Sequence, residues 1–147
     1  MREILFRGKR LQGGDWVEGY FFKSDINKRV RESGKATLIF TPDCDTFITV
    51  PECHNSFMVV SDTVGQYTGL TDKNGKRIFE GDVAKVLQGK DKDIAYVGFE
   101  NGAFMLYPKT GNIYERTLWE YWYNDWDVEV IGNVTDNPEL LENNLHS

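Results

Sequence analysis

Histidine and cysteine are scarce in this chain of 147 residues, which contains two of each. Catalysis of the Ser-His-Asp or Cys-His kind needs a histidine aligned with a nucleophile. His146 lies in the terminal tail, and the side chain of His54 points away from that of its neighbour Cys53 in an extended chain. We therefore do not expect a protease or an esterase.

Paired metal-ligand spacings are missing as well. Zinc sites usually show Cys-x-x-Cys or His-x-x-x-His, and the chain contains neither. Cys44, Cys53 and His54 could form a ligand set with Asp43 or Asp45, but two reduced thiols in loops or strands is the better interpretation. We expect no metal and no other cofactor.

Long apolar runs are also lacking. No stretch approaches the length that crosses a bilayer, and the apolar residues near the N-terminus are too few for a signal peptide. A mean hydropathy of −0.48 with 27% charged residues is typical of a folded, soluble protein. We expect a cytoplasmic protein of one domain, or of one domain with a small appendage.

The net charge of −6 is unevenly distributed. Residues 1–35 carry nine Lys/Arg against five Asp/Glu, whereas residues 36–147 carry eight against eighteen. Overall acidity argues against non-specific attraction to nucleic acid. The basic part keeps nucleic-acid binding open as an alternative, in which Tyr20 or Phe22 would stack on bases. The cations that would track phosphates are Lys28, Arg29, Arg31 and Lys35.

Turn chemistry and β-favouring residues are plentiful. Residues 3–10 and 16–22 predict an opening hairpin, and residues 36–40, 46–50 and 57–60 predict further short β runs. An Asn-Gly pair at residues 74–75 predicts a hairpin tip. The later β runs are residues 83–87, 94–99, 103–107 and 128–134.

We expect the last β runs to curl into a five-stranded barrel from about Val83 to Val134, because a meander otherwise leaves its edges exposed. The N-terminal strands would pack as a second β element. Asn137-Pro138-Glu139 predicts an N-cap and one short terminal helix.

An aromatic segment at residues 114–127 is the first candidate binding region. On a helix, Trp119, Trp122, Tyr123 and Trp126 fall at i, i+3, i+4 and i+7 and form one face. We favour this face as core that closes one end of the barrel, with part of its edge available to a partner. Tyr121 would then point away from the core, as a candidate contact residue.

Two other motifs invite functional interpretations. Gln66 and Tyr67 begin a polar and aromatic loop, but its glycines and hydroxyl group favour a structural role. Two aspartate pairs could bind a hard cation in a nuclease, although we interpret both as solvated loop residues. These pairs are Asp91 with Asp93 and Asp125 with Asp127.

The segment of residues 63–83, TVGQYTGLTDKNGKRIFEGDV, closely resembles the centre of the YopX family of phage and prophage proteins. Residues 2–8 and 16–20 resemble the opening hairpin of that family. Residues 128–134 and 137–141 resemble its closing motif. The resemblance implies an SH3-like barrel in the C-terminal half and a virus-derived protein that acts in the bacterial cytoplasm. It implies no activity and no catalytic residues.

We therefore expect a mainly β fold, with N-terminal hairpins over residues 1–62 and an SH3-like barrel with a short terminal helix over residues 63–147. The leading hypothesis is a non-catalytic module that binds a host or phage protein, with self-association left open. Its candidate binding residues are Gln66, Tyr67, Trp119, Tyr121, Trp122 and Trp126. Nucleic-acid binding is the alternative, and a metal-dependent enzyme comes last.

Overall fold

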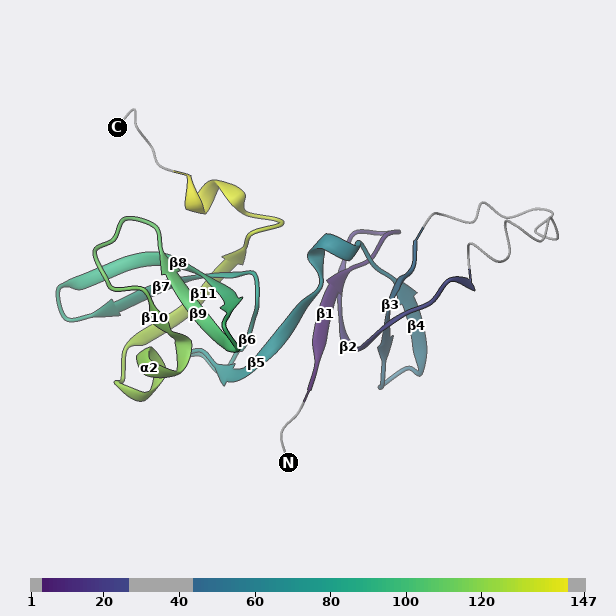
Figure 1. Cartoon of the computed structure of the whole chain (residues 1–147), viewed down its shortest axis with the longest axis horizontal. Coiled ribbons are helices and arrows are strands. Elements are labelled where there is room, and N and C mark those ends of the chain that lie inside the picture. The colour runs from purple at the N-terminus through teal and green to yellow at the C-terminus, as the bar shows by residue number, and fades with distance from the viewer. Residues whose placement is uncertain (1–3, 27–43, 143–147) are drawn as a thin grey trace. The chain divides into compact units, whose positions relative to one another are not determined.

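The computed structural model describes residues 4–26 and 44–142, and antiparallel β-sheet dominates them (Figure 1). These residues form two compact units, one within Glu3–Gln66 and one within Tyr67–Ser147. We call them the N-terminal unit and the C-terminal unit. The mainly β fold is confirmed, whereas the strand expected at residues 36–40 lies outside the described residues.

Four strands build the N-terminal unit. The first half of β2 pairs with β1, and its second half pairs with β3, so the expected opening hairpin and the strand expected at residues 46–50 are confirmed. The bounds are β1 (Phe6–Lys9), β2 (Trp16–Lys23), β3 (Thr46–Val50) and β4 (Asn55–Met58), followed by the 3-10 turn η1 (Ser61–Thr63).

Gly19 marks the point where β2 changes partners. It lies opposite Phe6 of β1, and a Cβ atom added to it would lie 1.9 Å from the carbonyl oxygen of Thr49. Only glycine permits this close backbone approach. Beside it, Ile48 and Val59 are completely buried and form the centre of a small core.

The C-terminal unit contains a five-stranded sheet in the order β10-β9-β8-β7-β11, together with a short β5–β6 ladder. Figure 1 shows α2 beside β9 and β10 of this sheet. The bounds are β5 (Gly65–Thr71), β6 (Arg77–Phe79), β7 (Asp82–Gln88), β8 (Asp91–Glu100), β9 (Ala103–Pro108), β10 (Arg116–Thr117), α2 (Leu118–Tyr123), β11 (Asp127–Asn133) and the 3-10 turn η2 (Pro138–Leu141).

Tight turns set the register of these strands. Asn101 and Gly102 have φ of 53° and 82° between the paired residues Glu100 and Ala103, which matches the two positive φ values of a type I′ hairpin. Gly75, with φ of 80°, ends the turn between β5 and β6 where the sequence predicted a hairpin tip.

The described residues form no closed barrel, so the expected barrel is not confirmed in them. Strands β10 and β11 are the two edges of the sheet and do not pair with each other. Strand β10 contributes only two residues, and Leu118 and Tyr121 of α2 fill the adjoining part of the core. A helix therefore covers the apolar surface that a closing strand would have covered.

The terminal helix appears as η2, a single 3-10 turn with Pro138 at its start, as predicted. The expected cap differs, because the side chain of Asn137 makes no capping hydrogen bond. Its Oδ1 accepts a hydrogen bond of 3.2 Å from the backbone N–H of Asn133 instead. In the part of the chain that the structure describes, no helix is long and apolar enough to span a membrane.

Candidate functional site

Helix α2 is held to the C-terminal unit by its inward residues. Leu118 and Tyr121, three positions apart on one face, are 1% and 2% exposed. The hydroxyl of Tyr121 donates a hydrogen bond to the carbonyl of Tyr114. Burial raises the pKa of Tyr121 and keeps this donor protonated. At the start of the helix, Thr117 accepts a capping hydrogen bond of 3.1 Å from the N–H of Glu120.

The opposite face of α2 presents three large aromatic side chains to solvent. Trp119 is 55% exposed, Trp122 48% and Tyr123 64%. The rings of Trp119 and Tyr123 stack at 4.8 Å with an interplanar angle of 16°. We call these three residues the α2 aromatic surface.

The sequence-based assignment of this face was therefore wrong. We expected Trp119, Trp122 and Tyr123 in the core and Tyr121 pointing away, but Tyr121 is the buried residue. Leu118 and Tyr121 share the other face of the helix, and that face turns toward the core because these two side chains pack there and Tyr121 hydrogen-bonds to Tyr114. The spacing of aromatic residues in the sequence does not show which face of the helix is buried.

The helix also ends earlier than the i+7 pattern required. Asp125 has φ of 59°, and the N–H of Trp126 donates to the carbonyl of Tyr121 at 3.1 Å while that of Asp125 donates to Trp122 at 3.3 Å. These two bonds define a Schellman motif, which stops the helix. Trp126 lies beyond it, half-buried, with its ring edge-on to Tyr121 at 5.0 Å.

A hollow of about 450 Å³ lies between α2, the turn after β5 and the start of β11. Its aromatic wall consists of Trp122, Tyr123 and Trp126. The remaining lining residues are Thr71, Asp72, Lys73, Asp125, Asp127 and Val128. We call this space the α2 hollow; all of its lining residues belong to the C-terminal unit.

Asp72 fixes one wall of the hollow. Its Oδ1 accepts hydrogen bonds of 2.9 Å from the N–H groups of Asn74 and Lys76, and its Oδ2 accepts one of 2.9 Å from Val130. Burial by itself would raise the pKa of Asp72, but the three backbone donors outweigh it and the pKa lies below its usual value. The carboxylate is therefore charged at neutral pH.

The hollow has a negative net charge, because three aspartates and only one lysine line it. Lys73 forms an ion pair of 3.1 Å with Glu129, and this hydrogen bond raises the pKa of Lys73. Among the described residues, no side chain forms an ion pair or a hydrogen bond with the carboxylate of Asp125 or Asp127, although the charge of Asp127 also helps to raise the pKa of Lys73. The α2 hollow therefore combines an aromatic wall with carboxylates, while its one ammonium group is already neutralised by a neighbour.

Gln66 and Tyr67 do not line the α2 hollow, and they lie in strand β5 rather than in the expected loop. Gln66 pairs with Phe6 of β1, and the ring of Tyr67 packs against Phe79 at 5.5 Å. The structural role predicted for this motif is confirmed at Thr68, whose hydroxyl donates to the carbonyl of Ile78 at 2.7 Å.

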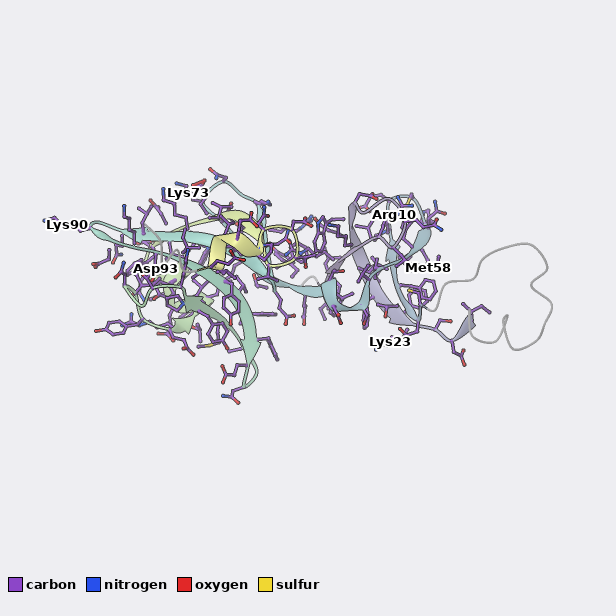
Figure 2. The ribbon with its side chains drawn as sticks, turned by 90° about the horizontal axis from the view of Figure 1, so that it is seen from above. Arg10, Lys23, Met58, Lys73, Lys90 and Asp93 are labelled. Carbon is purple, nitrogen blue, oxygen red and sulfur yellow. The ribbon has the colours of Figure 1, made fainter. Side chains whose placement is uncertain are left out.

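The aspartate pairs do not form a cation site in the described residues, where no group of three or more His, Cys, Asp or Glu side chains could hold a metal ion. The solvated-loop interpretation of Asp93 was also wrong. Asp93 lies buried on β8, and its carboxylate accepts hydrogen bonds from Thr110 and Asn112. Figure 2 shows it within the C-terminal unit, whereas Lys90 lies at the tip of the β7–β8 hairpin.

The basic residues of the nucleic-acid alternative lie outside the described residues, at Lys28, Arg29, Arg31 and Lys35. Its aromatic residues are described. Tyr20 is exposed on β2, and Phe22 stacks on Phe47 of β3 at 5.1 Å with an interplanar angle of 13°. Figure 2 labels Lys23, which ends β2 directly after Phe22.

Sequence reasoning missed the wall contributed by residues 71–73 because it lies about fifty positions before α2. One local signal was available: an aspartate that begins an Asp-x-x-Gly turn commonly accepts backbone N–H groups. That signal identifies Asp72 as a turn residue. It does not reveal that the turn meets β11 through the hydrogen bond from Val130.

Comparison with known proteins gives a family and a fold. The family model described as YopX protein matches residues 5–142. The crystal structure of protein EF1440 from Enterococcus faecalis is 22% identical, with a TM-score of 0.51, and the match covers 97% of this chain and 100% of that chain. This likeness concerns the fold alone. No curated protein matches the chain.

Proposed function

The chain belongs to the YopX family, and from this premise we propose that it is a phage- or prophage-derived accessory protein that binds another protein without catalysis. The SH3-like barrel stays a prediction, supported by the antiparallel meander of β7, β8 and β9. Action in the bacterial cytoplasm is part of the proposal. Its partner would be a host or phage protein.

One observation carries this proposal: the α2 aromatic surface. Three large aromatic side chains of one short helix are each about half exposed or more, between 48% and 64%, although burial of such rings is strongly favourable. Protein interfaces are enriched in Trp and Tyr, which often supply most of the binding energy. The stacked pair of Trp119 and Tyr123 is held in place before binding, which lowers the entropic cost of association.

Affinity capture from nuclease-treated host lysate tests the proposal when wild type and a matched pair of variants are compared. Trp119→Ala removes one ring of the stacked pair on α2. Phe99→Ala is the control, because Phe99 is 53% exposed and contacts Phe104 at 5.1 Å elsewhere in the same unit.

We expect wild type and Phe99→Ala to retain the same protein, and Trp119→Ala to lose it. Equal retention by both variants would assign binding to another surface. Absence of any specific protein in the wild-type sample would remove the main support for a binding module.

Nucleic-acid binding is a second candidate, favoured by the exposed Tyr20 beside the stacked Phe22 and Phe47 on one sheet face. Such rings would stack on unpaired bases. We would measure the fluorescence anisotropy of a labelled single-stranded oligonucleotide across salt concentrations. Binding that falls steeply with salt and is weakened by Tyr20→Ala would support it, and no binding at low salt would reject it.

A further inference from the structure

We infer that the α2 hollow accepts a cationic side chain, specifically an arginine of a basic segment in the partner protein. The inference rests on the proposed function and specifies the chemistry of the partner. It draws on the walls of the hollow, their charges and the position of the hollow beside the α2 aromatic surface.

The aromatic wall suits a cation. Trp122, Tyr123 and Trp126 line one side of the hollow, and the face of an indole or phenol ring attracts a guanidinium or ammonium group. Arginine fits better than lysine, because its planar guanidinium stacks on aromatic rings and is more weakly hydrated. Its aliphatic stem can lie along the same rings.

The carboxylates make the attraction selective for positive charge. Asp125 and Asp127 line the hollow without an ion-pair partner among the described residues. Asp72 lines it too, with a carboxylate that accepts three backbone hydrogen bonds. Lys73 pairs with Glu129 at 3.1 Å and also interacts with the charges of Asp127 and Asp72. One ammonium group among these carboxylates leaves the hollow negative. The same carboxylates would repel the phosphates of a nucleic acid, so a basic protein segment is the complementary occupant.

The hollow and the α2 aromatic surface share two residues. Trp122 and Tyr123 belong to both, and Tyr123 continues the exposed wall through its stack on Trp119. When an arginine of the partner occupies the hollow, the residues next to it in the partner would contact Trp119. This arrangement places a selective polar contact next to an aromatic anchor, as in many protein interfaces.

The test is an NMR titration of the full-length protein with two blocked tripeptides, acetyl-Gly-Arg-Gly-amide and acetyl-Gly-Gln-Gly-amide. We expect the arginine peptide to shift the indole N–H signals of Trp122 and Trp126 and the amide of Val128. The glutamine peptide should leave these signals unchanged. Equal shifts from both peptides would overturn the inference.

A matched pair of double variants separates the hollow from overall charge. Asp125→Asn with Asp127→Asn removes two charges at the hollow, and asparagine tolerates the positive φ of residue 125. Asp62→Asn with Asp91→Asn removes two exposed charges elsewhere. We expect about tenfold weaker binding of the arginine peptide in the first double variant and unchanged binding in the second.

If both double variants weaken binding equally, the attraction is general and the inference fails. A folded Asp127→Asn single variant, checked by its amide spectrum, keeps the test decisive if the double variant unfolds. Loss of partner capture by Trp119→Ala without an arginine-specific shift would refute the cation hollow alone. An arginine-specific shift without any captured protein would refute the proposed function instead.

Discussion

Asp72 is a single side chain that joins two separate parts of the C-terminal unit. Two of its hydrogen bonds close the turn after β5, and the third, from Val130, attaches that turn to β11. The ion pair of Lys73 with Glu129 connects the same two segments. One wall of the α2 hollow therefore depends on a buried carboxylate.

Replacement of Asp72 by asparagine should destabilise the protein at neutral pH. An amide has only one acceptor oxygen and would turn a donor toward a backbone N–H, so at least one hydrogen bond to a charged acceptor is lost. We expect a loss of about 2–3 kcal/mol in the free energy of unfolding, measured by chemical denaturation. Asp91→Asn, at an exposed position of β8, is the control and should change little.

The effect of Asp72→Asn should depend on pH with a defined sign. The pKa of Asp72 is lower in the folded protein than its usual value, so its stabilisation is complete above the unfolded pKa of about 4. It is lost as the pH falls below that value through the folded pKa. The difference between wild type and variant should shrink on acidification below about pH 4, and a difference independent of pH would contradict this account.

Residue roles were predictable where they depend on neighbours in sequence. The positive φ of Gly69 follows from a local motif, and the same motif predicts that the hydroxyl of Thr68 satisfies a peptide group, although not that this group belongs to Ile78. Asp93 was misjudged because its partners, Thr110 and Asn112, lie in a distant loop. The burial of Tyr121 was not predicted, because both faces of this helix carry aromatic residues and only its packing on the sheet decides which face is buried.

At the scale of elements, turn chemistry gave the strands their order and approximate limits. Gly75 has positive φ at the turn between β5 and β6, and Asn101 and Gly102 have positive φ at the turn between β8 and β9. Helix α2 was expected within residues 114–127, but it occupies only Leu118–Tyr123. Its limits depend on a cap at each end rather than on the spacing of aromatic residues.

The C-terminal end of α2 yields a prediction at residue 125. Asp125 adopts φ of 59°, where a Cβ atom costs energy and glycine does not. We expect Asp125→Gly to raise the free energy of unfolding by about 0.5–1 kcal/mol and Asp125→Ala to lower it by a similar amount. Chemical denaturation would measure both changes.

Asp125→Asn is the control for charge in that series. Asparagine keeps the tolerance for positive φ, so its stability should stay close to that of wild type. If alanine proves as stable as glycine at this position, backbone strain does not limit the end of the helix. A large loss with asparagine would instead assign a structural role to the carboxylate charge.

At the scale of the whole molecule, the sequence predicted a mainly β chain with two parts but not how the second sheet would end. Strand pairing between neighbours in the chain follows from turns, whereas closure of a barrel depends on which element covers the last apolar surface. Here α2 provides Leu118 and Tyr121 for that purpose. Short apolar runs cannot distinguish a covering helix from a closing strand.

Two separate cores imply that the units differ in their response to a core mutation. Ile48 is completely buried in the N-terminal unit, and Leu106 is completely buried in the C-terminal unit. The main apolar cluster, which includes Leu106, contains no residue that precedes Tyr67. Strand β5 takes part in both ladders, because Gln66 pairs with β1 and Tyr67 pairs with β6.

Ile48→Ala and Leu106→Ala form a matched pair for testing this independence. Each should cost about 2–5 kcal/mol in its own unit, since each leaves a cavity in a packed core. Hydrogen exchange followed by mass spectrometry should show lost protection in β2 and β3 for Ile48→Ala, and in β8 and β9 for Leu106→Ala. Equal loss in both sets of strands for either variant would show that β5 couples the units into one cooperative structure.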